Sequence, residues 1–204
     1  MSAALWSLEV DHTAPATYLA DEVLLRETLK GGLSPATVRS ALAACSTGST
    51  LTLDLVKPDG KGLYEHAVSV GDMLLFNWLP VFSERAYDLL IAEGCDAEEF
   101  IDCRLRVLGN THFKVHIPLQ SYDVLDFARC VAMGSVPLTP PIPFHFVSAH
   151  LKPSSRALPP CFRVPAPGHP QVLAELFARD ALHSAWSTAG YRGATFRPLS
   201  YGAA

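Results

Sequence analysis

Length, composition and charge exclude several classes of protein for this chain. It has 204 residues, of which 49% are hydrophobic and 18% charged, and its mean hydropathy is +0.20. A chain of this size and apolar content can bury a stable core, which excludes an intrinsically disordered protein. Sixteen Lys and Arg against twenty Asp and Glu give a net charge of −4. Because no basic run accompanies this acidic balance, a nucleic-acid-binding protein is not expected.

Neither a secretory signal nor a membrane span is expected. The N-terminal sequence is acidic and lacks the basic and apolar regions of a signal peptide. The longest stretch without Asp, Glu, Lys or Arg is 130–151, and four prolines interrupt it, which a membrane-spanning helix would not carry. This stretch is therefore predicted to be a buried or partner-facing loop.

The cysteine content favours a reducing compartment. There are five cysteines, an odd number without a C-x-x-C spacing or the regular framework of a secreted disulfide-rich protein. The chain is therefore expected to be cytoplasmic, with reduced thiols. Apolar neighbours favour a small buried hydrophobic side chain over a nucleophile at each position, namely Cys45, Cys95, Cys103, Cys130 and Cys161.

The elements expected in the first part of the chain mix strands with helices. Residues 5–10 are short and apolar and predict a strand, whereas 13–30 show a weakly helical pattern. A Ser-Pro pair opens a predicted helix over 34–48, with Ser as N-cap and Pro in the first helical position. Alternation of Leu with polar residues predicts a half-buried strand over 50–56, and Pro-Asp-Gly at 58–60 predicts the turn that ends it.

The central part predicts a strand, a capped helix and a hairpin. The apolar residues 73–79 predict a buried strand that leads into a helix N-capped by Ser83 and ended by Gly94. Two further strands, 100–108 and 111–118, flank a Gly-Asn pair suited to positive φ, which predicts a hairpin.

The last part of the chain is rich in proline and ends in a helix and a strand. Ten of the sixteen prolines lie in 137–170, which is expected to be an extended, irregular link over the surface. Periodicity alone predicts a short helix over 122–131. A final helix is predicted to end at Gly190, and a terminal strand to follow over 195–199.

The chain also contains a weak internal similarity at an offset of 96 residues. Gly94 and Phe100 correspond to Gly190 and Phe196, each pair following a helix. Either this is a chance match, because a helix–Gly–strand connection is common, or two helix–strand units contribute to one mixed sheet. The second interpretation predicts positive φ at both glycines and two phenylalanines buried in the same sheet.

Familiar catalytic and metal-binding signatures are absent from the sequence. It contains no phosphate-binding loop, dinucleotide-binding glycine motif, nucleophile elbow or zinc-binding helix motif. His112 and His116 would lie on one face of a strand, but no third ligand type accompanies them, so no metal and no cofactor are expected.

An acidic run follows Gly94 and is the one candidate binding surface. Paired carboxylates could perform acid–base chemistry if they were buried together, but an exposed run is more often solvated. We therefore expect these carboxylates to bind a partner, because acidic groups accelerate association with a basic protein. The run consists of Asp96, Glu98, Glu99 and Asp102.

Two segments carry a resemblance to a known family. They are PVFSERAYDLLIAEG at 80–94 and STAGYRGATFRPL at 187–199. Together they resemble a family of bacterial immunity proteins from polymorphic toxin systems, represented in myxobacteria and other proteobacteria. The family order is a Ser-capped helix, a D-x-L-D segment, an F-R pair and a C-terminal A-G-x-x-G-x-x-F-x-P-L motif. Its elements here are Ser83, Tyr122–Cys130 with Asp123 and Asp126, Cys161-Phe162-Arg163, and Ala189-Gly190, Gly193, Phe196 and Pro198.

The resemblance modifies two local predictions. The family order implies an extended segment rather than a helix over 122–131. Arg179 stands where the second unit should have its Ser cap, so either Asp180 caps that helix or the helix begins earlier, near Pro170.

The fold expected for residues 1–204 is a single α+β domain, a mixed or antiparallel sheet with a few packed helices. Possible sub-units are 1–120 and 121–204, with the Pro-rich link 137–170 in the second. The resemblance implies a cytoplasmic immunity protein that binds and neutralises a cognate toxin domain and has no catalytic residue. The alternative is a small hydrolase or transferase whose Cys, His and Asp residues come together only in the fold. A third possibility is a self-associating structural protein.

Overall fold

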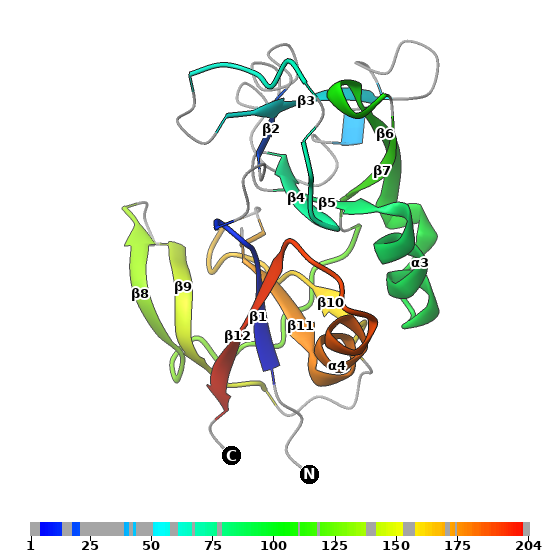
Figure 1. Ribbon diagram of the computed structural model, residues 1–204. Coiled ribbons are helices and arrows are strands. Elements are labelled where there is room, and N and C mark those ends of the chain that lie inside the picture. Colours follow the sequence, from blue (N-terminus) through cyan, green and yellow to red (C-terminus); the bar gives the residue numbers. More distant parts are fainter. Residues whose placement is uncertain are drawn as a thin grey trace.

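Two β-sheets with helices packed beside them form an α+β architecture in the computed structural model (Figure 1). The barrel strands lie at the top of the view, the second sheet lies below them, and helices α3 and α4 lie to one side. The structure describes residues 5–13, 18–20, 39–40, 43, 51–57, 61–66, 68–76, 79–109, 111–117, 119–137, 142–152, 158–169, 172–173 and 175–201.

The first sheet is a closed barrel with the strand order β2-β3-β6-β7-β5-β4. Strand β3 runs parallel to β6 and β2 runs parallel to β4, while the remaining neighbours are antiparallel. The strands are β2 (Tyr18–Ala20), β3 (Leu51–Val56), β4 (Met73–Phe76), β5 (Leu79–Ser83), β6 (Phe100–Leu105) and β7 (Thr111–His116).

The barrel interior confirms the alternating pattern predicted for 50–56. Leu51, Leu53 and Leu55 are buried in one apolar cluster, and the residues between them are partly exposed. The strand predicted over 73–79 is instead two antiparallel strands, β4 and β5, in which Phe76 pairs with Leu79. A continuous apolar run does not show where the chain reverses, because strands on both sides of the turn are buried.

The second sheet has six strands in the order β10-β11-β1-β12-β9-β8. Strands β12 and β9 are parallel, and the other neighbours are antiparallel. The N-terminal strand therefore belongs to the sheet that the C-terminal residues form. The strands are β1 (Leu5–Val10), β8 (Val131–Val136), β9 (Ile142–Ala149), β10 (Cys161–Phe162), β11 (Leu176–Arg179) and β12 (Ala194–Tyr201).

Helix α3 (Glu84–Ala92) begins and ends as its sequence predicts, and helix α4 (Asp180–Ala189) ends as predicted. Ser83 caps α3, since its Oγ accepts a hydrogen bond from the Ala86 N–H at 3.3 Å. Gly94 and Gly190 have φ of 105° and 67°, which confirms the positive φ expected at both helix ends. Both alternatives for the start of α4 are wrong: the helix does not begin near Pro170, and its N-cap residue is Arg179, whose side chain makes no capping hydrogen bond. Asp180 is the first helical residue, and its carboxylate accepts a hydrogen bond from the Trp6 indole at 3.2 Å.

One apolar cluster joins the two sheets. It contains Phe82 of the barrel, Leu90 of α3, and Leu182 and Trp186 of α4, all buried. Phe100 and Phe196 pack against this cluster, but they lie on β6 and β12, in different sheets, and both are only partly buried. The prediction of two phenylalanines buried in one sheet is therefore wrong. The two helix–strand units face a common core from separate sheets.

Several other expectations need correction. Residues 18–20 form a strand rather than part of a helix, because pairing with β3 overrides a weak helical pattern. The uncharged stretch 130–151 is mainly the hairpin β8–β9, not a loop, and the Pro-rich link contains β9 and β10. The short helix that periodicity predicts over 122–131 is absent, and 127–129 form a turn, so this segment is not extended throughout either.

Three predictions reach parts of the chain that the structure only partly describes, and of the first, the helical pattern over 13–30, only 13 and 18–20 are among the described residues. In the helix predicted over 34–48, Arg39, Ser40 and Ala43 are helical, and the remaining residues lie outside the described ones. The predicted turn at 58–60 also lies outside them. In the described part of the chain, no helix combines the length and apolar character that a membrane crossing requires.

Candidate functional site

The acidic run is not one continuous exposed patch. Asp96, Glu98 and Asp102 are exposed, but Glu99 is buried. The Asp96 carboxylate accepts a hydrogen bond from the Glu98 N–H at 2.9 Å and caps the short helix η1 (Ala97–Glu99). Asp102 forms an ion pair with Lys114 across the β6–β7 pair. The exposed charge available to a partner is therefore smaller than the sequence indicates.

Glu99 and His116 form a buried polar pair. The Glu99 Oε2 atom lies 3.2 Å from His116 Nε2, and its Oε1 accepts a hydrogen bond from the Leu119 N–H at 2.9 Å. Burial lowers the pKa of His116, and the adjacent Glu99 carboxylate opposes this effect only in part. The imidazole is therefore neutral at pH 7. The pair lies under α3 beside Phe82 and Phe100 and is not open to a substrate.

The two histidines considered for metal binding have different environments. His112 is exposed on β7, whereas His116 on the same strand is fully buried. Among the described residues, no group of three or more His, Cys, Asp or Glu side chains is arranged to hold a metal ion.

The described cysteines are mostly buried, as predicted. Cys95, Cys103 and Cys161 are buried and Cys130 is partly buried, while Cys45 lies outside the described residues. Burial raises the pKa of Cys103 to about 12 and also raises the pKa of Cys130, which keeps both thiols protonated. Neither thiol is activated as a nucleophile.

Asp72 connects the barrel to the loop between α4 and β12. Its nearly buried carboxylate accepts hydrogen bonds from the Arg85 guanidinium at 2.5 Å, the Ser83 hydroxyl at 2.8 Å and the Arg192 N–H at 2.9 Å. Burial alone would raise the pKa of Asp72, but these hydrogen bonds outweigh it and lower the pKa. Because these donors all belong to the protein, the role of Asp72 is structural: it holds the segment before β4 against the loop between α4 and β12.

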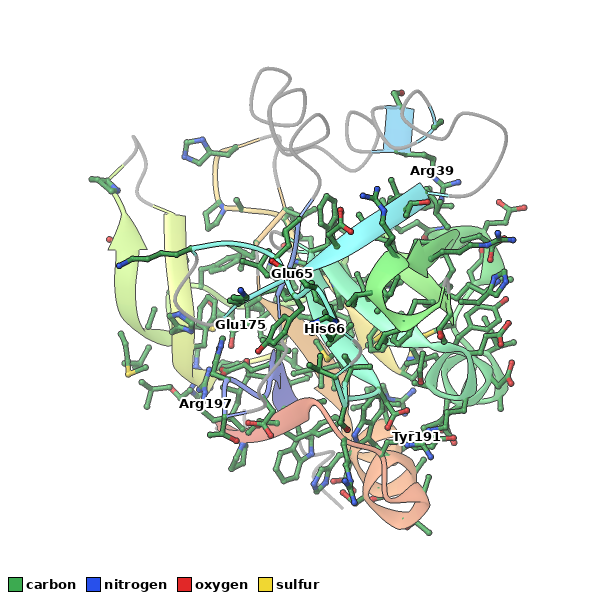
Figure 2. The ribbon with its side chains drawn as sticks, turned by 45° about the horizontal axis from the view of Figure 1, so that its top comes forward. Arg39, Glu65, His66, Glu175, Tyr191 and Arg197 are labelled. Carbon is green, nitrogen blue, oxygen red and sulfur yellow. The ribbon has the colours of Figure 1, made fainter. Side chains whose placement is uncertain are left out.

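A second cluster of ion pairs and hydrogen bonds, centred on Arg197, holds β9 beside β12. The guanidinium of Arg197 contacts the Glu9 carboxylate at 2.7 Å and the Glu175 carboxylate at 3.1 Å, and it donates to the Phe146 carbonyl. Glu175, which directly precedes β11, and Arg197 of β12 are labelled in Figure 2. The Glu175 carboxylate also accepts a hydrogen bond from the Phe146 N–H at 3.1 Å. Because one guanidinium occupies both carboxylates, this cluster positions β9 and is not set up for acid–base catalysis.

The β8–β9 hairpin supports the strongest candidate for a binding surface. Five large hydrophobic side chains are exposed in the described part of the chain, and three of them lie on this hairpin. They are Val131, Met133 and Val147, with exposed fractions of 54%, 69% and 47%. Strand β8 is also the terminal strand of its sheet among the described residues. We name these three side chains the hairpin patch.

An open pocket of about 400 Å³ lies beside the hairpin patch. Apolar residues from both hairpin strands and from a neighbouring loop line it, among them Phe127, Phe146 and Pro167. Met133 belongs both to the pocket wall and to the hairpin patch. The apolar surface therefore includes a concavity into which a partner side chain could insert.

Sequence reasoning chose the acidic run and missed the hairpin patch. A signal was available, since residues 130–151 contain no Asp, Glu, Lys or Arg. Which face of the hairpin points outward could not be deduced, because the bulge between Val131 and Ala132 shifts the strand register.

No protein-family model and no curated protein matches this chain.

Proposed function

We propose that this chain is an immunity protein that binds a cognate toxin domain in the cytoplasm and blocks its active site or its access to substrate. The observation that carries the proposal is the hairpin patch on a terminal strand. Edge strands are normally protected by charges, prolines or a covering element. Within Val131–Val136 no charge and no proline is present. An apolar, uncharged edge is typical of the centre of a protein–protein interface.

The resemblance described above supports the same conclusion. The C-terminal motif Ala189-Gly190, Gly193, Phe196 and Pro198 spans the end of α4, the loop that follows it and β12. Arg197 of β12 in turn holds β9, one strand of the hairpin, through the Phe146 carbonyl. The motif residues would then have a structural role, because they build the sheet on which the hairpin patch is displayed.

The acidic run is proposed to have a different role from the hairpin patch. Helix α3, which the run follows in sequence, lies on the side of the molecule opposite β8 (Figure 1). A direct contact with one small partner at both places is therefore not expected. We propose that the exposed carboxylates Asp96, Glu98 and Asp102 steer a basic toxin domain during approach, and that the hairpin patch forms the contact.

Co-expression with the toxin domain encoded by the adjacent open reading frame tests the proposal. The wild-type chain should restore growth, whereas a Val131→Lys, Met133→Lys double variant should lose protection while remaining folded. Both side chains are mostly exposed, so the double variant should unfold at nearly the wild-type temperature.

Matched controls are available on other surfaces. Leu63 and Leu119 have exposed fractions of 44% and 40%, so Leu63→Lys and Leu119→Lys change surface hydrophobicity to a similar extent elsewhere. Both single variants should protect normally. Full protection by the double variant would exclude the hairpin patch as the contact, and failure of the wild-type chain to protect would contradict the immunity function.

A further inference from the structure

Two buried thiols from distant parts of the chain lie next to each other. The Sγ atoms of Cys95 and Cys161 are 3.6 Å apart, although the residues are 66 positions apart in sequence. Cys95 follows α3, and Cys161 lies on β10 of the six-stranded sheet. Both belong to the apolar cluster that the two sheets share.

The backbone on both sides holds this arrangement. The Cys95 N–H donates to the Leu90 carbonyl at 2.9 Å, which closes the last turn of α3. Cys161 pairs with Ala178 of β11, and the Arg179 N–H donates to the neighbouring Pro160 carbonyl at 2.9 Å. The contact is therefore set by backbone hydrogen bonds on both sides, and the sulfurs, 3.6 Å apart, would have to move closer by about 1.5 Å to form a disulfide bond.

The other described cysteines are in different surroundings and serve as internal controls. Cys103 is buried in the barrel core, in a separate apolar cluster. The Cys130 Sγ accepts a hydrogen bond from the His150 N–H at 3.3 Å, near the hairpin.

From this juxtaposition we propose that Cys95 and Cys161 are an oxidation site, which a peroxide converts to a disulfide joining the segment after α3 to β10 of the six-stranded sheet. One thiolate attacks a peroxide oxygen, breaks the O–O bond and becomes a sulfenic acid, while hydroxide leaves and is protonated to water. The second thiolate attacks the sulfenic sulfur, forms the S–S bond and displaces a second hydroxide, which also leaves as water. Two thiols are oxidised by two electrons, and one hydrogen peroxide is reduced to two waters.

The surroundings of the two thiols make this oxidation slow in the folded protein. The hydrogen bond with Cys95, together with burial, raises the pKa of Cys161 well above its ordinary value, and the nearby Arg163 guanidinium opposes this only in part. The Cys161 thiol is therefore protonated at neutral pH, and both sulfurs are shielded by burial. The pair should withstand brief exposure to peroxide and react during longer exposure, when local opening admits the oxidant.

Oxidation should stabilise the fold, because the new bond closes a long loop in the unfolded chain. Since the bond would join the segment after α3 to β10, it should directly oppose the separation of these two parts of the chain. The unfolding temperature of the oxidised protein should be higher than that of the reduced protein by roughly 5–10 °C. This inference is independent of the proposed immunity function and needs no toxin for its test.

Peptide mapping after peroxide treatment provides the test. Trypsin cleavage after Arg and Lys places Cys95 and Cys103 in one peptide, 86–104, and Cys161 in another, 157–163. The experiment therefore uses a Cys103→Ala background, in which Cys95 is the only thiol of its peptide. The purified protein is incubated with hydrogen peroxide for minutes and for hours, digested without reduction and analysed by mass spectrometry.

The expected product is peptide 86–104 linked to 157–163, two mass units lighter than the sum of the reduced peptides and lost on reduction. Thermal unfolding of the same samples should show the rise in unfolding temperature, and adding Cys161→Ala should abolish both effects. If Cys161→Ala lowers the folded yield, Cys95→Ala provides the same control. Irreversible oxidation of either thiol without the linked peptide, or linkage with no change in unfolding temperature, would overturn the proposal.

Discussion

Gly71 and Gly193 lie backbone against backbone where the segment before β4 meets the loop between α4 and β12. A Cβ atom added at Gly71 would lie 2.5 Å from the Gly193 Cα atom. Gly193 also has φ of +87°, and a Cβ atom there would lie 2.5 Å from the Met73 carbonyl oxygen. The contact leaves no space for a side chain, and it lies beside the hydrogen bonds that join Asp72 to Arg192.

Gly193→Ala should therefore destabilise the protein strongly. The methyl group meets backbone atoms that cannot rotate away, and the positive φ adds strain, for a loss on the order of 2–5 kcal/mol. Gly190→Ala is the matched control, because Gly190 also has positive φ but an added Cβ meets nothing within 4 Å. That variant should lose only about 1–2 kcal/mol in denaturant unfolding. Equal losses for the two variants would contradict the close contact.

The pH dependence of stability should report on His116. Burial lowers the pKa of His116 below its ordinary 6.5, so the unfolded chain binds a proton more readily than the folded chain. The free energy of unfolding is therefore highest, with respect to this group, above about pH 7. It falls as the pH drops through 6.5 toward the lowered pKa of His116, by at most about 1.4 kcal/mol per pH unit. Denaturant unfolding at pH 7.5 and 5.5 measures it.

His116→Gln should flatten this pH dependence, because glutamine keeps a polar partner for Glu99 but does not titrate. His112→Gln, at an exposed position on the same strand, should retain the wild-type slope. If the wild type and His116→Gln lose stability equally between these two pH values, another group is responsible.

Steering by the acidic run can be tested at Glu98. Glu98→Lys should slow association with the toxin domain on the order of twofold or more at low salt and leave the unfolding temperature nearly unchanged, because the residue is exposed. Glu65→Lys makes the same charge change at an exposed position outside the run (Figure 2) and should have a smaller effect. Stopped-flow association at two salt concentrations distinguishes the variants, and identical rates would exclude steering.

Charge reversal at Glu99 should behave differently from reversal at Glu98. Glu99 was predicted to share an exposed surface, but its carboxylate is buried against His116 and the Leu119 N–H. Glu99→Lys should therefore lower the free energy of unfolding by about 3 kcal/mol or more, since it leaves a charge in the interior. A Glu99→Lys protein of normal stability would show that this pair is open to solvent.

The chemical groups that an enzyme would use should be dispensable for protection. No single Cys→Ala or His→Gln substitution should abolish growth rescue while folded protein is retained, because an immunity protein acts through a surface. Complete loss of rescue by a fully folded variant would instead favour the hydrolase or transferase alternative. The positions are Cys45, Cys95, Cys103, Cys130, Cys161, His112 and His116.

Local sequence signals predicted several features of individual elements. The Ser83 cap, the positive φ of Gly94 and Gly190, and the buried face of β3 all depend on residues close together in the chain. Helix caps, positive φ at glycine and the alternation of apolar and polar residues depend on short segments of chain. They can therefore be predicted before the fold is known.

The sequence by itself therefore determined an α+β protein with capped helices, an alternating barrel strand and one conspicuously uncharged segment. The tertiary structure alone decided that β1 joins the C-terminal sheet and that Phe100 and Phe196 face one core from two sheets. It also decided that Glu99 is buried and that Cys95 meets Cys161. Each of these results brings together segments far apart in the chain, and the free energy of such contacts depends on packing that no short stretch of residues encodes.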